Sequence, residues 1–455
     1  MTSRERVELA LNHREADRVP LDLGASAVTG MHVSSVYALR QRMGLDPPGT
    51  PVKVVEPYQM LGEIAPDLMD ALGVDVVGLG APTNMFGFRN DGWKPWTFFD
   101  GTPVLVPEAF NTDPEPNGDI LMYPEGDKSA PPSGHLPKGG FYFDTIVRQD
   151  PLEEDALTAE DNLQEFQPVS DEVVEHYRAG AERLAATGRA ILANFGGTAF
   201  GDIALVPAPW LKHPRGIRDI AEWYMSTTAR FDLVQEIFDR QCAIALANWE
   251  KLHRAVGDRV TAVFVTGTDF GTQHGPFISP QAYRDLFKPF HRRVNDWVHT
   301  HTNWKTFIHS CGAVSAFLDD FVDAGFDILN PVQCSAAGMD PETLKAKHGD
   351  RITFWAAAWT PRARSPSAPP TTCAARSASG SASSALVAAS SSTPPTTSRP
   401  KSPSRTSRPC TRPWPSAGSI RMRTESAALP SAHWRTRPLR CARIFLFRRG
   451  TRGRG

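Results

Sequence analysis

Several side chains that can transfer protons or act as nucleophiles follow short apolar runs of this sequence. Asp269 lies after one run, and His309-Ser-Cys311-Gly312 ends another. A carboxylate, an imidazole and a thiol together can carry out acid–base and nucleophilic chemistry. We therefore predict catalytic roles for Asp269, Gln273 and His309. Other polar residues at the ends of apolar runs are predicted to bind substrate: Asp22, Asn194, His274, Asn330 and Gln333.

The apolar runs themselves alternate with helical stretches along residues 1–355. The runs are Val19–Gly24, Val74–Leu79, Ala190–Asn194, Val260–Val265, Lys305–His309, Phe326–Asn330 and Arg351–Trp355. Continuous apolar strands that alternate with helices are typical of a parallel sheet covered on both faces. We predict an α/β fold, a (β/α)8 TIM-type barrel without its eighth strand and last helices. A doubly wound open sheet is the alternative. In such a barrel the residues that follow the strands meet at one rim.

Residues 89–145 break this alternation with aromatic side chains set among turn residues. We expect a β-hairpin excursion on the barrel rim, which either walls a pocket or stabilises the fold.

No apolar run approaches the ~20 residues that span a bilayer. The N-terminus carries charges where a signal peptide has its apolar core, and it reads as a helix with Thr2 and Glu5 at capping-box spacing. Six cysteines in 455 residues are too sparse for a disulfide framework. These features predict a cytoplasmic protein without a membrane partner.

The charge of the chain is divided unevenly. Residues 1–355 hold 31 Lys and Arg against 49 Asp and Glu, a formal balance of −18, whereas residues 356–455 hold 18 against 1, a balance of +17. The second segment consists mainly of Ala, Ser, Pro, Thr and Arg without sustained apolar periodicity, so it cannot bury a core. One interpretation is a disordered basic tail that touches nucleic acid or acidic surfaces through its charge.

We favour a second interpretation, in which residues 356–455 are translated out of frame. Shifting GC-rich codons for Ser383–Ser392 by one base gives ILGPGGGFVF, and neighbouring segments give helix-like and turn-like text. One base lost after Trp355 suffices for the shift. The reframed GGGFVF would supply the eighth strand, and no nucleic-acid partner is then expected.

Residues 1–355 resemble the uroporphyrinogen decarboxylase (URO-D) superfamily, which includes corrinoid-dependent methyltransferases. The resemblance rests on short motifs in one order: Arg4-Glu-Arg-Val, Arg18-Val-Pro, Gly73-Val-Asp75, Asp269-Phe-Gly-Thr-Gln273, Ile278–Tyr283 with Pro289-Phe290, His309-Ser-Cys311-Gly312 and Asp327–Gln333. Each motif alone is weak, and His-Ser-Cys-Gly in this context is the most specific.

The methyltransferase branch implies zinc, a corrinoid partner protein and a small-molecule substrate. Zinc binds imidazole and thiolate, and it holds a substrate thiol as a thiolate. The resemblance places His309 and Cys311 as ligands. That branch takes a third ligand, a Cys, after the last strand, where the reframed text has Gly-Gly-Gly, so Cys334 is the substitute that we predict. Asp269 is a carboxylate ligand or a general base.

The decarboxylase branch implies a carboxylate-rich tetrapyrrole held by Arg residues after the first strand. Here that segment, Gly24–His32, contains no Arg. Tetrapyrrole decarboxylation is therefore the alternative function, and an inactive truncated barrel is a third. Barrels of this kind often pair, so a homodimer is a further expectation. Losing one strand of eight would expose two unpaired edges, which predicts aggregation or partial unfolding.

Overall fold

The computed structural model describes residues 1–357 and the strand at residues 384–387. The chain divides into residues 1–393 and 394–455, and all of the second unit lies outside the described residues. The predicted disordered or out-of-frame tail therefore falls largely outside them. None of the helices described is long and apolar enough to cross a membrane.

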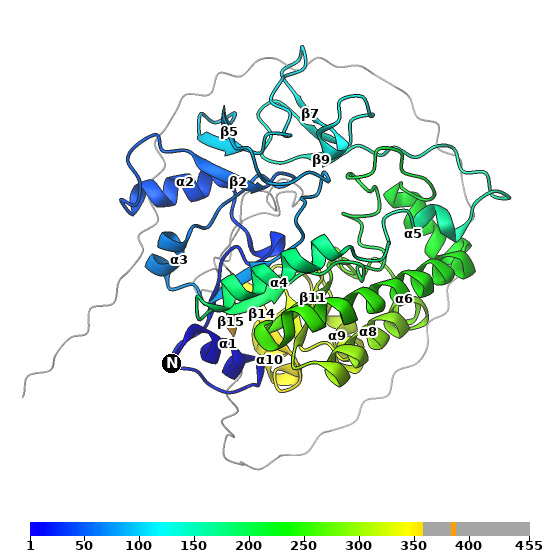
Figure 1. Cartoon of the computed structure of the whole chain (residues 1–455). Coiled ribbons are helices and arrows are strands. Elements are labelled where there is room, and N and C mark those ends of the chain that lie inside the picture. Colours follow the sequence, from blue (N-terminus) through cyan, green and yellow to red (C-terminus); the bar gives the residue numbers. More distant parts are fainter. Residues whose placement is uncertain (358–383, 388–455) are drawn as a thin grey trace, which may run out of the picture. The chain divides into compact units, whose positions relative to one another are not determined.

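All seven predicted strands are present and belong to one eight-stranded sheet (Figure 1). The sheet order is β1-β15-β14-β13-β12-β11-β10-β4. Its strands are β1 (Leu21–Asp22), β4 (Val76–Leu79), β10 (Ala190–Ala193), β11 (Ala262–Thr266), β12 (Lys305–His309), β13 (Ile328–Asn330), β14 (Thr353–Ala357) and β15 (Ser384–Val387).

The pairings confirm an α/β fold with a partial TIM-type barrel. Each pair from β4 to β14 in the sheet is parallel. The exception is β15, which pairs antiparallel with both β14 and β1. Two antiparallel steps mean that β1 runs in the same direction as β14. A parallel eighth strand is thus missing from the described residues, as expected, and β15 lies in its position in the opposite direction.

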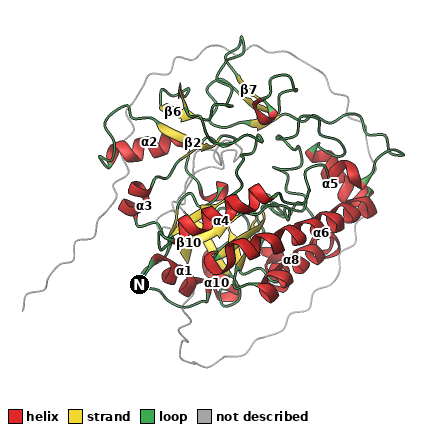
Figure 2. Cartoon of the chain, viewed as in Figure 1, coloured by secondary structure: helices red, strands yellow, loops and turns green. Residues whose placement is uncertain are grey.

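The longer helices are α1 (Ser3–Leu11), α2 (Val33–Arg42), α4 (Asp171–Ala185), α5 (Ile220–Ala229), α6 (Phe231–Val256), α8 (Lys288–His301) and α10 (Pro341–His348). Helices such as α4, α6 and α8 cover the outer face of the barrel sheet, whereas α1 packs on its other side and α2 lies apart from it (Figure 2). The shorter ones are α3 (Pro66–Leu72), α7 (Pro280–Ala282) and α9 (Leu318–Asp323). The predicted capping box starts α1, because Glu5 N–H donates to Thr2 Oγ1 and Thr2 N–H donates to Glu5.

Alternate strand residues face opposite sides, as strand geometry requires. Leu192, Phe307 and Ile328 pack together with Val7 of α1, and we call their side the inner face. Neighbours one residue away, such as Ile191 and Ile308, pack in the larger core with the helices. Because His309 and Asn330 share the parity of Phe307 and Ile328, their side chains belong to the inner face.

The excursion is larger than the predicted hairpin at 89–145. Two small sheets form there, in the orders β3-β2-β6-β5 and β7-β8-β9. Their strands are β2 (Val52–Glu56), β3 (Leu61–Gly62), β5 (Lys94–Thr97), β6 (Pro103–Val106), β7 (Ile120–Met122), β8 (Gly134–Leu136) and β9 (Asp144–Thr145). The sheets share a separate core in which Phe86, Phe110 and Phe143 are buried. This core explains the aromatic residues of the excursion.

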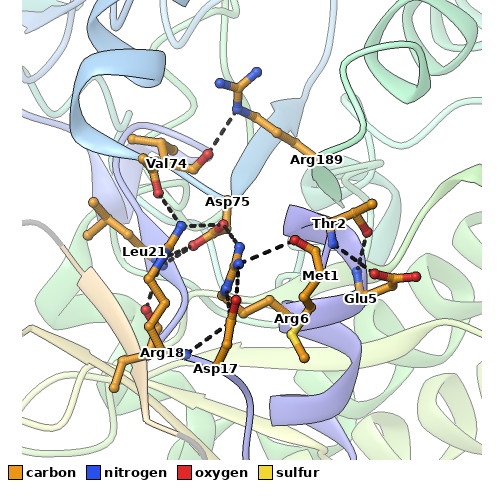
Figure 3. A network of polar contacts seen from close by, with 12 residues as sticks. Met1, Thr2, Glu5, Arg6, Asp17, Arg18, Leu21, Val74, Asp75 and Arg189 are labelled. Atoms are coloured by element: carbon orange, nitrogen blue, oxygen red, sulfur yellow. Dashed lines mark hydrogen bonds and ion pairs between the residues drawn. The ribbon is translucent and has the colours of Figure 1, made fainter.

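One buried carboxylate ties the first strand to the second strand of the barrel (Figure 3). Asp75 is fully buried and accepts from Arg6 at 2.7 Å and from Arg18 at 2.6 and 2.9 Å. Its Oδ2 also accepts from Leu21 N–H at 2.8 Å, while its own N–H donates to the Leu21 carbonyl. Asp75 thus fastens α1 and β1 to β4 at the ends of the strands opposite His309.

We expect Asp75→Ala to lower the free energy of unfolding by about 3–5 kcal/mol. The variant removes the buried carboxylate that pairs with the guanidinium of Arg6. The matched control is Asp17→Ala, which removes the exposed partner of Arg6 and should cost much less, because solvent screens this pair. Urea unfolding of both variants checks this. Equal losses would contradict the role given to Asp75.

Candidate functional site

Parallel pairing brings the ends of β11, β12 and β13 to one rim. His309 and Asn330 are direct partners in the β12–β13 register. Asp269 lies three residues after β11, and Cys311 lies two residues after β12. The three loops that carry the predicted site residues therefore begin side by side.

At this rim Asp269, His309 and Cys311 form a cluster whose ligand atoms all lie within 4.8 Å of one another. Cys311 Sγ is 3.3 Å from His309 Nε2, and Asp269 Oδ1 is 4.0 Å from that nitrogen. The backbone N–H of Cys311 donates to Asp269 Oδ1 at 2.6 Å. All three side chains are partly exposed and line one cavity. The structure thus brings a carboxylate, an imidazole and a thiol together.

Asn330 determines which nitrogen of His309 faces the cluster. Asn330 is buried, and its Nδ2 donates to the carbonyl oxygen of Trp355 at 2.9 Å. A carbonyl oxygen only accepts, so the amide orientation is fixed and Asn330 Oδ1 is left as an acceptor. His309 Nδ1 lies 2.7 Å from that oxygen and must donate to it. The lone pair of Nε2 then points toward Cys311 and Asp269.

Trp355 is itself held by Asp22, which was predicted to bind substrate. The indole Nε1 donates to Asp22 Oδ2 at 3.0 Å, and Ala25 N–H donates to Asp22 Oδ1 at 3.1 Å. Asp22 is fully buried and is not part of the cavity wall. Burial raises the pKa of Asp22 to about 7. In the structure Asp22 supports Trp355 and so belongs to the scaffold behind Asn330.

Close backbone packing fixes the loop of Cys311. Gly312 has φ +85°, and a Cβ at this position would lie 2.3 Å from the carbonyl oxygen of Gly271. Both the backbone conformation and the lack of space therefore require glycine here. Gly312 N–H also donates to Gln333 Oε1 at 2.8 Å, and Gln333 Nε2 donates to Gln273 Oε1 at 3.0 Å. These contacts hold the loop after β12 against the loop that contains Asp269.

Of the remaining predicted site residues, some lie on the cavity wall and others lie away from it. Asn194 and Gln333 line the cavity, whereas Gln273 and the exposed His274 are not part of its wall. Cys334 is exposed, and its thiol contacts the carbonyl oxygen of Val332 at 3.4 Å. It does not belong to the cluster, whose third member is Asp269. The loop after β13 turns the Cys334 side chain outward.

The cavity has a volume of about 1540 Å³ and reaches from the strand ends to the small sheets. Two of its carboxylates, Asp202 and Glu56, escaped sequence analysis. Burial raises the pKa of each to about 7, and for Asp202 the nearby Asp269 contributes to the rise. Burial, together with Asp269 and Asp202, also raises the pKa of the Cys311 thiol. Asp202 comes from a loop and Glu56 from the excursion, and no spacing in the sequence links either to the cluster.

Among Lys and Arg residues, one side chain occurs on the described wall of the cavity. Arg218 is buried and forms a two-point ion pair with Glu165, at 2.8 and 3.1 Å. A tetrapyrrole with many carboxylates needs several free guanidinium or ammonium groups. The described wall offers none.

Sequence comparisons find no protein family and no curated protein that match this chain. A structure comparison finds a methyltransferase from Methanosarcina mazei, with a TM-score of 0.40 and 16% identity, over 78% of this chain and 83% of that chain. At this level of similarity no residue role transfers to this chain.

The raised pKa of Asp22 makes folding stability depend on pH. From about pH 4 to about pH 7 the unfolded chain has already lost the Asp22 proton that the folded chain keeps, so the free energy of unfolding falls as pH rises. Between about pH 5 and about pH 8 we expect the free energy of unfolding of Asp22→Asn to fall by up to about 3 kcal/mol less than that of the original chain. Denaturant unfolding at both pH values measures this difference. An equal fall in the free energy of unfolding of the two proteins would show that folding does not raise the pKa of Asp22.

Proposed function

We propose that Asp269, His309 and Cys311 bind zinc and that the protein transfers a methyl group to or from a small molecule. The single observation that carries the proposal is the convergence of the three ligand atoms within 4.8 Å at the mouth of a large cavity. Nitrogen, sulfur and oxygen donors are the set that zinc prefers.

The separations also fit zinc. Ligand atoms about 2.0–2.3 Å from a tetrahedral zinc lie about 3.3–3.8 Å apart. The distances from His309 Nε2, 3.3 Å to Cys311 Sγ and 4.0 Å to Asp269 Oδ1, differ from this range by a few tenths of an ångström at most. The hydrogen bond from His309 to Asn330 is the kind of support that orients imidazole ligands in zinc sites. Three protein ligands leave a fourth position for a ligand from the cavity.

Bound zinc would hold a substrate thiol as a thiolate at neutral pH. Asp269 Oδ1 accepts from Cys311 N–H at 2.6 Å, which orients this carboxylate as the oxygen ligand, and the proton that the thiol loses would pass to solvent. The cavity wall would orient the rest of the substrate and exclude water from the sulfur.

Methyl transfer to that sulfur needs a donor with a good leaving group. A carbon–sulfur bond forms as the bond between the methyl carbon and the donor breaks, and the electron pair of the broken bond stays on the donor. A methylated corrinoid on a partner protein fits this role, because cobalt can keep the pair. We propose such a partner as the donor, and the reverse reaction would demethylate a thioether.

The test is zinc content followed by methyl transfer. We expect about one zinc per chain, loss of that zinc in His309→Ala, and methyl transfer from methylcobalamin to a thiol only in the zinc-loaded protein. His274→Ala is the matched control, because His274 is exposed and lies off the cavity wall. Its zinc content should not change. Full zinc retention in His309→Ala, or a zinc-loaded protein without methyl transfer, would reject the proposal.

A second variant separates orientation from ligation. Asn330→Leu keeps the volume of a buried side chain but removes the acceptor for His309 Nδ1. We expect its zinc affinity to fall by about 10–100-fold while some zinc still binds. An unchanged affinity in a folded Asn330→Leu protein would show that His309 needs no such support.

A further inference from the structure

The charge of the large cavity is unbalanced. Six carboxylates occur on its described wall, and two of them have basic partners: Glu165 pairs with Arg218, and Glu125 pairs with Lys212 at 2.9 Å. The other four form no ion pair with any Lys or Arg of residues 1–357. They are Glu56, Asp144, Asp202 and Asp269.

Three of these carboxylates, Glu56, Asp144 and Asp202, line the cavity together with the phenol of Tyr58. Burial raises the pKa of Tyr58, and the negative charges of Asp144, Glu56 and Asp202 raise it further. Tyr58 N–H donates to Glu56 Oε1 at 3.1 Å, and Gln59 N–H donates to Glu56 Oε2 at 2.7 Å, so the main chain fixes the carboxylate of Glu56 on the cavity wall.

Asp202 connects this group to the reactive cluster. Its Oδ1 accepts from Ala204 N–H at 3.0 Å, and its Oδ2 lies against Gly267, where a Cβ would be 2.6 Å away. Glu56, Asp202, Asp269 and Cys311 all line the same cavity.

A buried amide gives a second and independent observation. Gln241 is 3% exposed, lines the cavity, and uses its Nε2 to donate to the Gly197 carbonyl at 2.9 Å. Its Oε1 accepts from none of the described residues, so the amide offers an acceptor to whatever fills the cavity.

Other charges near the cavity do not balance the acids. Burial lowers the pKa of His32, whose Nδ1 accepts from Ser34 N–H, so this histidine is neutral. Arg148 lies off the wall and donates to the backbone carbonyls of Ala208 and Leu211. Aromatic rings complete the wall, among them Tyr58, Phe143 and Trp210. Aromatic faces and carboxylates are the two groups that attract organic cations in proteins.

We propose that the substrate of this cavity is an aminothiol, a small molecule that carries a thiol and a positively charged ammonium group. The ammonium binds between Glu56, Asp202 and the ring of Tyr58, and the thiol reaches the cluster of Asp269, His309 and Cys311. The position of the thiol rests on the proposed function, whereas the binding of the ammonium group does not.

Three thiols of similar size and different charge test this proposal. Calorimetry on the zinc-loaded full chain at about pH 8, where Glu56 and Asp202 are ionised because their pKa values are about 7, should give cysteamine an affinity about tenfold or more above that of 2-mercaptoethanol, and 3-mercaptopropionate the weakest binding. Glu56→Gln should lower the affinity for cysteamine severalfold and leave that for 2-mercaptoethanol unchanged. Glu125→Gln is the matched control, because Glu125 lines the same cavity but pairs with Lys212. It should leave both affinities unchanged.

The zinc-free protein separates this proposal from the proposed function. There, ethanolammonium should bind and propionate should not, and Asp202→Asn should weaken ethanolammonium. Equal binding of the three thiols, or tighter binding of the anionic one, would overturn the aminothiol proposal even if zinc binds. Ethanolammonium binding in a protein that takes up no zinc would support the ammonium-binding subsite and reject the proposal that the substrate thiol binds at the cluster.

Discussion

The arrangement of the site depends on the parallel register of β12 and β13. His309 and Asn330 are direct partners in that register, so an imidazole and an amide meet on the inner face. Asn330 can support His309 because Trp355, from the next strand in the sheet, supplies a carbonyl oxygen that fixes the amide. A shift of one residue between these strands would turn one side chain to the outer face and break the contact. The chemistry at the rim therefore depends on main-chain pairing below it.

Contacts at the opposite ends of the strands stabilise the fold. Asp75 gathers Arg6, Arg18 and the backbone of Leu21 at a buried position, and it joins β1 to β4. This division agrees with barrel enzymes in general, where one rim holds the reactive groups and the other holds the fold together. Between β14 and β1 the described chain has only the short antiparallel β15. Whether the tail is out of frame stays a prediction of the sequence.

The sequence predicted the barrel strands well because they contain apolar runs, such as Ala190-Ile-Leu-Ala193, whose bounds match β10. It also predicted that Asp269, His309 and Cys311 lie together, since each follows a strand. It did not predict that Asp22 and Asn330 are buried supports, because a polar residue at a strand end has the same pattern whether it faces a substrate or a neighbouring strand. Glu56 and Asp202 were missed because they come from the excursion and from a loop, where folding alone brings them to the cavity. Nothing in the sequence excluded Cys334 from the predicted ligands, because residue spacing does not determine where a loop side chain points.

X-ray absorption at the zinc edge tests the central claim most directly. The account predicts one sulfur at about 2.3 Å, from Cys311, with nitrogen and oxygen ligands at about 2.0–2.2 Å, and a second sulfur when a thiol is added. A zinc environment without sulfur, or one that adding a thiol does not alter, would contradict it.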